Sequence, residues 1–148
     1  MVALATLPYP RFCASTIEVD SFERRYTVDT LTEMQRLYPS AQLLFMMGTD
    51  MYQEIQTWHE FRRLFELAHL VIVNRPGFPL RDDLAAVRTV RENEPLELPD
   101  RPSVYSVPYV DQPVSSTAIR DERKRGGNIR SWVPDLVWNY IQKHQLYI

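Results

Sequence analysis

Cysteine, long apolar runs and an excess of charge of either sign are all nearly missing from this chain of 148 residues. The single cysteine, Cys13, excludes an internal disulfide and any metal site built from several cysteines. No apolar run approaches the ~20 residues that a transmembrane helix needs, and no secretory signal sequence is evident. A net charge of −2 favours neither nucleic acid nor an acidic membrane surface as partner. We therefore expect a soluble, cytoplasmic protein with a single domain over residues 1–148.

Alternating apolar and amphipathic segments predict an α/β fold with a mostly parallel sheet flanked by helices. The runs at 43–47 and 69–73 are apolar without alternation, which is typical of fully buried parallel strands. Further strands are expected at 12–19 and 104–107. Apolar residues at helical spacing predict helices at 1–7, 27–37, 51–55, 57–67, 82–91, 115–124 and from 134 onward.

Two of the expected helix starts carry capping signals. Thr27 is expected to be the N-cap of the helix at 27–37, with Asp29 complementing the helix dipole. The sequence at 57–60, Thr-Trp-His-Glu, matches a capping box with Thr at the N-cap. The backbone amides of Trp58 and His59 would then lie in the first turn. A bound carboxylate is favoured there over a neutral amide.

The stretch at 114–120, Val-Ser-Ser-Thr-Ala-Ile-Arg, combines helix-capping residues with a misplaced cation. Ser115, Ser116 and Thr117 are residue types that cap helix N-termini. Arg120 lies in the first turn, where the helix dipole disfavours a cation by a few tenths to about 1 kcal/mol. A bound phosphate would remove this cost. This stretch alone leaves two interpretations open, a phosphate site or an ordinary cap with a solvated arginine.

Three polar motifs are expected at one edge of the sheet. Gly-Thr-Asp at 48–50 and Arg-Pro-Gly at 75–77 each follow an expected strand, and 114–120 follows the strand at 104–107 after a loop. In parallel α/β sheets, ligands bind beyond the carboxyl ends of the strands. We therefore expect these three motifs to converge on one crevice.

A series of short motifs covers nearly the whole chain in a recognisable order. They are Tyr-Thr-Val-Asp-Thr-Leu at 26–31, Gly-Thr-Asp at 48–50, Trp-His at 58–59, His-Leu-Val-Ile-Val at 69–73, Arg-Pro-Gly at 75–77, Ser-Ser-Thr-Ala-Ile-Arg at 115–120, Val-Pro at 133–134, Tyr-Ile at 140–141 and Leu-Tyr at 146–147. Together they resemble the bacterial nicotinate-nucleotide adenylyltransferase family. The resemblance implies a Rossmann-like nucleotidyltransferase fold and adenylyl transfer from ATP to nicotinate mononucleotide, giving deamido-NAD and pyrophosphate in NAD biosynthesis.

One family motif has no counterpart in the sequence. The glycine- and histidine-rich turn Gly-x-Phe-Asp-Pro-x-His-x-Gly-His cradles the ATP phosphates in the family, whereas His59, His69 and His144 are isolated here. We therefore expect an N-terminally truncated family member, a single nucleotidyltransferase-like domain that is incomplete at its N-terminus. These 148 residues alone are expected to have little or no activity. The alternative is a non-catalytic nucleotide-binding or interaction module derived from that family.

The resemblance implies an ATP site with Arg120 as its catalytic residue. Arg120 would stabilise the leaving pyrophosphate, and Mg²⁺ would accompany the triphosphate without a dedicated metal site in the protein. The full set of implied ATP and phosphate residues is Gly48, Asp50, Ser115, Ser116, Thr117 and Arg120. For Asp50, which would bind an adenosine ribose hydroxyl, a helix-capping role is the structural alternative.

A second implied site holds nicotinate mononucleotide through Thr27, Trp58, His59 and Arg75. Trp58 would pack against the pyridine ring, and its alternative is a partly buried packing residue. The alternative for Thr27 is a simple N-cap, and for Arg75 a surface arginine in a turn. The expected partners are these small-molecule substrates, with no nucleic acid or membrane, and the oligomeric state, including a homo-oligomer, stays open.

Overall fold

The computed structural model describes residues 1–21, 25–80, 84–108, 110 and 114–148. The chain divides into two compact units. The first, here the helical unit, comprises Met1–Thr16 and Val114–Ile148, and the second, the sheet unit, comprises Ile17–Pro113. Within the described ranges, no helix is long and apolar enough to cross a bilayer. The assignment of the whole chain to one domain stays a prediction.

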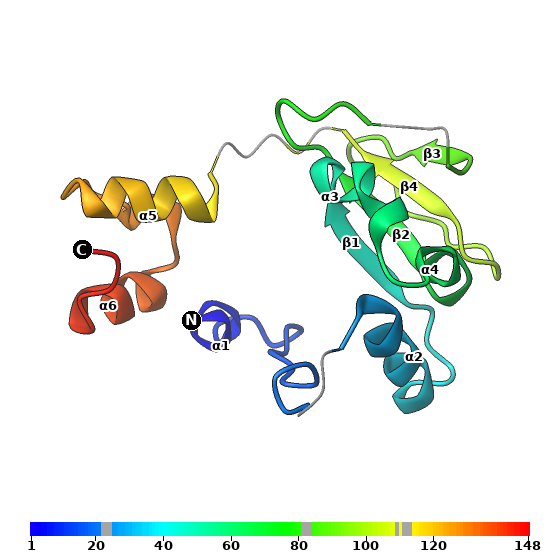
Figure 1. Ribbon diagram of the computed structural model, residues 1–148, viewed down its shortest axis with the longest axis horizontal. Coiled ribbons are helices and arrows are strands. Elements are labelled where there is room, and N and C mark those ends of the chain that lie inside the picture. Colours follow the sequence, from blue (N-terminus) through cyan, green and yellow to red (C-terminus); the bar gives the residue numbers. More distant parts are fainter. Residues whose placement is uncertain (22–24, 81–83, 109, 111–113) are drawn as a thin grey trace. The chain divides into compact units, whose positions relative to one another are not determined.

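The sheet unit contains a four-stranded parallel sheet in the order β1-β2-β4-β3 (Figure 1). The strands are β1 (Leu44–Gly48), β2 (His69–Val73), β3 (Val87–Thr89) and β4 (Val104–Val107). The register places Met46 opposite Val71 and Val71 opposite Tyr105. The parallel pairing confirms the predicted α/β class, and β2 and β4 have the predicted bounds.

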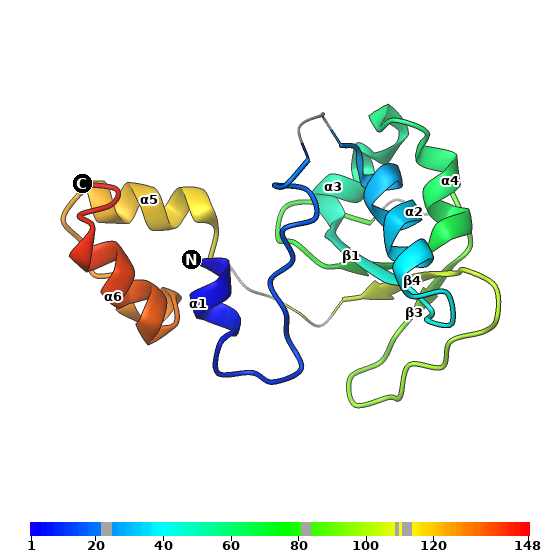
Figure 2. The same cartoon turned by 90° about the horizontal axis from the view of Figure 1, so that it is seen from below.

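Helices α2 (Thr27–Leu37) and α4 (Phe61–Leu67) lie side by side on one face of this sheet (Figure 2). Val28 and Leu31 of α2 and Leu64 of α4 are buried in one core with Leu70 and Ile72 of β2. The apolar residues of α2 recur at helical spacing, so the helix buries one stripe and leaves Leu37 at its end 47% exposed. Between β1 and α4 lie α3 (Thr49–Gln53) and the 3₁₀ turn η1 (Ile55–Thr57).

The structure corrects three of the segments predicted between residues 12 and 91. Residues 12–19 form turns and loop and no strand. The predicted helix at 82–91 contains β3 instead, because pairing with β4 overrides the local helical pattern, and residues 82–83 lie outside the described ranges. The strand predicted to be fully buried, β1, leaves Leu44 43% and Met46 68% exposed. In the described sheet, β1 has a neighbour on one side only.

The start of α2 differs by one residue from its prediction. Tyr26, in extended conformation, is the N-cap, and Thr27 is the first helical residue. The Tyr26 backbone amide donates a 2.9 Å hydrogen bond to the Asp29 carboxylate, which satisfies an amide at the helix start. The structural role predicted for Asp29 is therefore confirmed, whereas the N-cap role predicted for Thr27 is wrong.

The observed start of α4 lies several residues after the predicted helix start at Thr57. The helix begins at Phe61, and its N-cap is Glu60 in the left-handed region, with φ of 47°. Thr57 belongs to η1, where its hydroxyl donates to the Glu54 carbonyl at 2.7 Å. Trp58 follows in extended conformation, with φ of −78° and ψ of 149°. The predicted capping box at 57–60 is wrong, because this turn and the extended residue precede the helix.

The helical unit is built from α1 (Val2–Thr6), α5 (Ser116–Lys124), the 3₁₀ turn η2 (Arg130–Trp132) and α6 (Asp135–Lys143). Its buried core is Ile129, Val137 and Ile141, against which Leu4 and Ile119 pack. Among the other apolar residues of α6, Leu136 and Tyr140 are 39% and 38% exposed. Gly126 follows the C-cap of α5 with φ of +75°, a left-handed conformation that glycine adopts without strain at a helix end.

Candidate functional site

A pocket of about 290 Å³ lies between the start of α2 and the segment that leads into α4. We call it the α2–α4 pocket. Its wall consists of Arg25, Tyr26, Thr27, Thr57, Trp58 and His59. Thr27, Trp58 and His59 come from two motifs far apart in the sequence. The structure thus brings together three of the four residues predicted to bind nicotinate mononucleotide.

Trp58 forms part of this wall and also packs against the sheet unit. Its ring meets Phe45 of β1 edge-on, with centroids 6.2 Å apart. It is one of the partly buried residues around the main core. Packing fixes the indole position, which confirms the alternative of a partly buried packing residue, and the contact with a pyridine ring stays a prediction.

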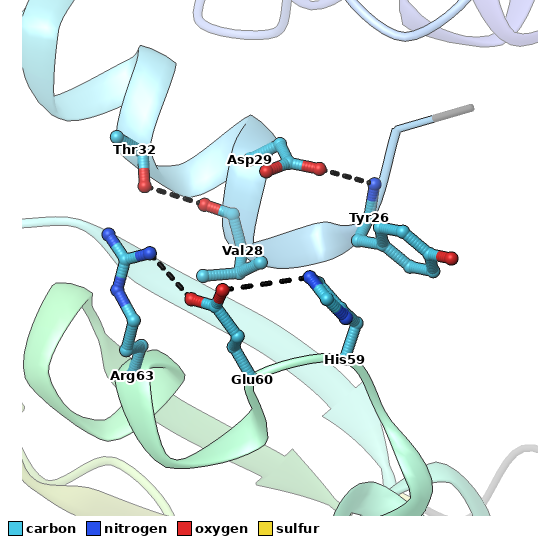
Figure 3. A network of polar contacts seen from close by, with 7 residues as sticks. All are labelled: Tyr26, Val28, Asp29, Thr32, His59, Glu60 and Arg63. Atoms are coloured by element: carbon cyan, nitrogen blue, oxygen red, sulfur yellow. Dashed lines mark hydrogen bonds and ion pairs between the residues drawn. The ribbon is translucent and has the colours of Figure 1, made fainter. Parts of the chain in front are cut away.

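His59 is held by the ring of Tyr26 at the start of α2 and by the Glu60 carboxylate at the start of α4 (Figure 3). Its ring stacks on Tyr26 with centroids 4.3 Å apart and an interplanar angle of 28°. The Nε2 atom of His59 lies 3.6 Å from Oε1 of Glu60, and the other oxygen of Glu60 accepts a 2.6 Å hydrogen bond from Arg63. This hydrogen bond raises the pKa of Arg63. The left-handed backbone of Glu60 places its carboxylate between the two partners.

The carboxylate site predicted from a helix start at Trp58 and His59 is wrong. Neither amide lies in the first turn of a helix, because α4 begins at Phe61. The Trp58 amide already donates to the Ile55 carbonyl at 3.0 Å. A helix dipole therefore does not favour a carboxylate at these two amides.

A second polar cluster, the Asp50 corner, lies where β1 and β2 end. Arg75 Nη1 is 2.5 Å from Asp50 Oδ2, and the Arg75 backbone amide donates to the Thr49 hydroxyl at 3.0 Å. A Cβ atom on Gly48 would collide with the Asp50 carboxylate, so any other residue here would displace that side chain. Asp50 Oδ1 is buried and has no hydrogen-bond partner among the described residues. Two of the three polar motifs therefore meet at the carboxyl edge, as predicted.

Arg75 belongs to this corner and does not form the wall of the α2–α4 pocket. Its guanidinium neutralises Asp50 in a partly buried pair, with side chains 48% and 23% exposed. Arg75 is nevertheless exposed and stands at the turn it shares with Pro76 and Gly77, which agrees with the alternative of a surface arginine in a turn. Its assignment to nicotinate mononucleotide stays a prediction.

The start of α5 belongs to the helical unit. Ser115 is the N-cap, and its hydroxyl accepts a 3.1 Å hydrogen bond from the Ala118 amide, which confirms its capping role. Arg120 Nη2 lies 3.3 Å from the Thr117 hydroxyl, and both side chains are exposed, as is Ser116. The hydroxyls and the guanidinium thus gather at one helix end. Their convergence with the Asp50 corner stays a prediction.

Sequence reasoning missed Arg25, Tyr26 and Thr57 as wall residues. A signal for Arg25 was present, because it stands directly before a helix start, where the dipole disfavours a cation. The same signal had drawn attention to Arg120. Within the described ranges, no cluster of three or more His, Cys, Asp or Glu side chains suits a metal ion.

A parallel α/β sheet with polar groups at neighbouring carboxyl ends is typical of nucleotide-binding proteins. Consistent with this class, the sequence profile described as cytidylyltransferase-like matches residues 1–122. A protein of Thermus thermophilus named probable nicotinate-nucleotide adenylyltransferase is 44% identical over 147 residues, which cover 99% of this chain and 70% of that protein. One of the same name from Corynebacterium jeikeium is 37% identical, covering 100% and 72%. The chain belongs to the nicotinate-nucleotide adenylyltransferase family.

Among solved structures, the fold is similar to Plasmodium falciparum nicotinic acid mononucleotide adenylyltransferase complexed with APC. The TM-score is 0.60 at 22% sequence identity, and the match covers 85% of this chain and 60% of that chain. This likeness supports the fold. The chain thus spans about 70% of the length of the two curated relatives above and 60% of that solved chain.

Proposed function

We propose that this chain acts in the transfer of AMP from ATP to nicotinate mononucleotide, which yields deamido-NAD and pyrophosphate. The observation that carries the proposal is the α2–α4 pocket. In a member of this family, it unites Thr27 with Trp58 and His59. Its volume of about 290 Å³ suits a pyridine ring with its substituent and part of a ribose, since whole ligands of drug size fill ~300–1,000 Å³.

In this proposal, the pyridine ring of nicotinate mononucleotide packs against Trp58. The indole offers a large flat surface, and its contact with Phe45 holds it in place. His59, stacked on Tyr26, and Thr27 border the same ring. Arg75 is assigned to the nucleotide side of this substrate, at the carboxyl edge of the sheet.

ATP is assigned to the Asp50 corner and the start of α5. The buried Oδ1 atom of Asp50 has no described partner, so a ribose hydroxyl of adenosine can donate to it. Gly48 leaves the backbone open at this point. The β- and γ-phosphates are assigned to four residues at the start of α5, namely Ser115, Ser116, Thr117 and Arg120.

The chemistry requires positioning and charge stabilisation. A phosphate oxygen of the mononucleotide attacks the α-phosphorus of ATP, a new P–O bond forms, and the bond to the β-phosphate oxygen breaks. No covalent enzyme intermediate is involved, so the protein lowers the barrier by orientation and electrostatics. Arg120 is assigned to the charge that develops on the leaving pyrophosphate. Mg²⁺ would enter with ATP, held mainly by phosphate oxygens and water.

The proposal is tested by measuring deamido-NAD formation from ATP, Mg²⁺ and nicotinate mononucleotide by chromatography. For a longer polypeptide in which the Gly-x-Phe-Asp-Pro-x-His-x-Gly-His segment precedes these residues, we expect turnover on the order of 1–10³ per second. For residues 1–148 alone we expect little or no turnover, because this sequence lacks that phosphate-binding segment.

Two outcomes would contradict these expectations. Full turnover by residues 1–148 alone would show that the missing motif is dispensable. No deamido-NAD from the longer polypeptide would refute the proposed function and favour the non-catalytic nucleotide-binding or interaction module.

A further inference from the structure

The wall of the α2–α4 pocket carries positive charge that no wall residue neutralises. Arg25 is a cation at all ordinary pH values. Tyr26, Thr27, Thr57 and Trp58 are uncharged at neutral pH, and none of the six wall residues is a carboxylate. A pocket of this composition favours an anionic ligand, or an anionic end of a ligand.

His59 does not account for this excess of positive charge. Its Nε2 atom faces the Glu60 carboxylate at 3.6 Å. Glu60 is itself held by Arg63 through a 2.6 Å hydrogen bond (Figure 3). The Arg63 guanidinium and the Glu60 carboxylate balance each other, so this group adds no net charge to the wall while the imidazole is neutral.

Arg25 also lacks a carboxylate of its own among the described residues. The nearest candidates along α2 have other partners. Asp29 accepts from the Tyr26 amide at 2.9 Å, and Glu33 is bound by Arg36 through hydrogen bonds of 2.7 and 2.9 Å. The charge of Arg25 helps to lower the pKa of Glu33, but the two side chains do not form an ion pair, and Glu33 is paired with Arg36. The Arg25 side chain is exposed, so it is free to meet a ligand.

We propose that Arg25 is a specificity-determining residue that binds the carboxylate of the pyridine ring when nicotinate mononucleotide occupies the α2–α4 pocket. This inference rests on the proposed function. Arg25 and Trp58 both line the pocket, so a ring packed on the indole brings its substituent near the guanidinium. A planar guanidinium matches a carboxylate with two parallel hydrogen bonds, which a neutral carboxamide cannot reproduce. The choice of acid over amide substrate is thus assigned to a side chain rather than to a helix start.

The experiment measures binding of nicotinate mononucleotide and nicotinamide mononucleotide to residues 1–148 by NMR titration. The indole N–H signal of Trp58, assigned with Trp58→Phe, reports on this pocket, and Trp132 and Trp138 in the helical unit serve as internal references. Arg25→Gln is expected to weaken the acid form about 10- to 100-fold and the amide form less than about threefold. Arg25→Lys is expected to lie between Arg25→Gln and the unmodified chain, because it keeps the charge and loses the planar fork.

Arg62→Gln is the matched control, since it removes an exposed cation on α4 that does not line the pocket. It should leave both affinities unchanged. Equal weakening of both mononucleotides by Arg25→Gln would overturn the inference, because the guanidinium would then contact the shared phosphate or merely shape the wall. Unchanged binding in Arg25→Gln would overturn it as well.

Different results would contradict the assignment of the pocket and the role of Arg25. If neither mononucleotide shifts the Trp58 signal of the unmodified chain, the pocket itself is misassigned, and the proposed function loses its main support. If both mononucleotides bind the unmodified chain and Arg25→Gln changes both affinities equally, only the role of Arg25 is wrong.

Discussion

The α2–α4 pocket and the start of α5 are both polar sites at helix starts, but they are held in different ways. The pocket joins residues that are far apart in the sequence, and the buried core around Leu64 and Leu70 fixes its two walls. The start of α5 consists of consecutive residues, organised by one N-cap hydrogen bond at Ser115. The first site depends on tertiary packing, and the second on local helix geometry.

This difference has a practical consequence. A change in the core of the sheet unit should disturb the pocket without touching any of its wall residues. A change at the start of α5 should act only through the residue replaced. The predictions below test that contrast in order of decreasing effect.

Leu70→Ala is expected to lower the unfolding free energy of the sheet unit by ~2–5 kcal/mol, because Leu70 is fully buried in its core. Denaturant titration followed at the Trp58 signal measures the loss. Leu7→Ala, at a position 73% exposed, is the control and should change little. If the denaturant midpoint of the Trp58 signal is the same in Leu70→Ala as in the unmodified chain, the core does not hold the pocket in place.

Arg120→Ala is expected to lower kcat/KM for ATP by about 10- to 150-fold in the longer polypeptide, which corresponds to ~1.5–3 kcal/mol for a charge-assisted contact. The unfolding free energy should stay nearly constant, since Arg120 is exposed. Arg125→Ala, at the other end of α5, is the control for loss of a cation. Equal effects of the two substitutions on ATP use would argue against the phosphate role.

Ser115→Ala is expected to destabilise α5 by ~1 kcal/mol, because the Ala118 amide loses its acceptor. Thermal unfolding reported by the Trp138 signal in the helical unit measures the change. Ser116→Ala, one residue further, should have a smaller effect, because no hydrogen bond of its side chain occurs in the described part of the chain. If Ser116→Ala destabilises α5 more than Ser115→Ala does, Ser116 rather than Ser115 is the N-cap.

His69 should make stability depend on pH below neutrality. Its side chain is 2% exposed, its Nδ1 accepts a 3.2 Å hydrogen bond from the Ser103 amide, and burial lowers its pKa below the ordinary value near 6.5. The unfolded chain therefore gains a proton before the folded chain does. Stability is complete above about pH 6.5 and falls as the pH drops toward the lowered pKa.

The change at neutral pH is expected to be negligible, which makes this the smallest effect of the four. Unfolding free energies measured between pH 7 and pH 5 test it. His69→Phe should reduce the pH dependence, and His144→Gln, at an exposed position, should leave it unchanged. If the unfolding free energy of His69→Phe depends on pH as strongly as that of the unmodified chain, other groups cause the dependence.

The predicted strands and helices succeeded where a strong local pattern agreed with the packing. The apolar run of β2 and the N-cap at Ser115 are examples. Predictions failed where a local signal competed with tertiary contacts. The Thr-Trp-His-Glu sequence has the composition of a capping box, yet η1 and the extended Trp58 place the helix start at Phe61. Residues 87–89 pair with β4 despite a helical pattern.

The sequence by itself determined the parallel α/β class, the family and the cap at Ser115, because each depends on residue types at fixed spacing along the chain. Only the tertiary structure decided which side chains face each other. It set Arg75 against Asp50, stacked His59 on Tyr26 and placed Arg25 in the wall of a pocket with Trp58. The physical reason is that core packing fixes the separation of α2 and the segment before α4, and no local pattern encodes that distance.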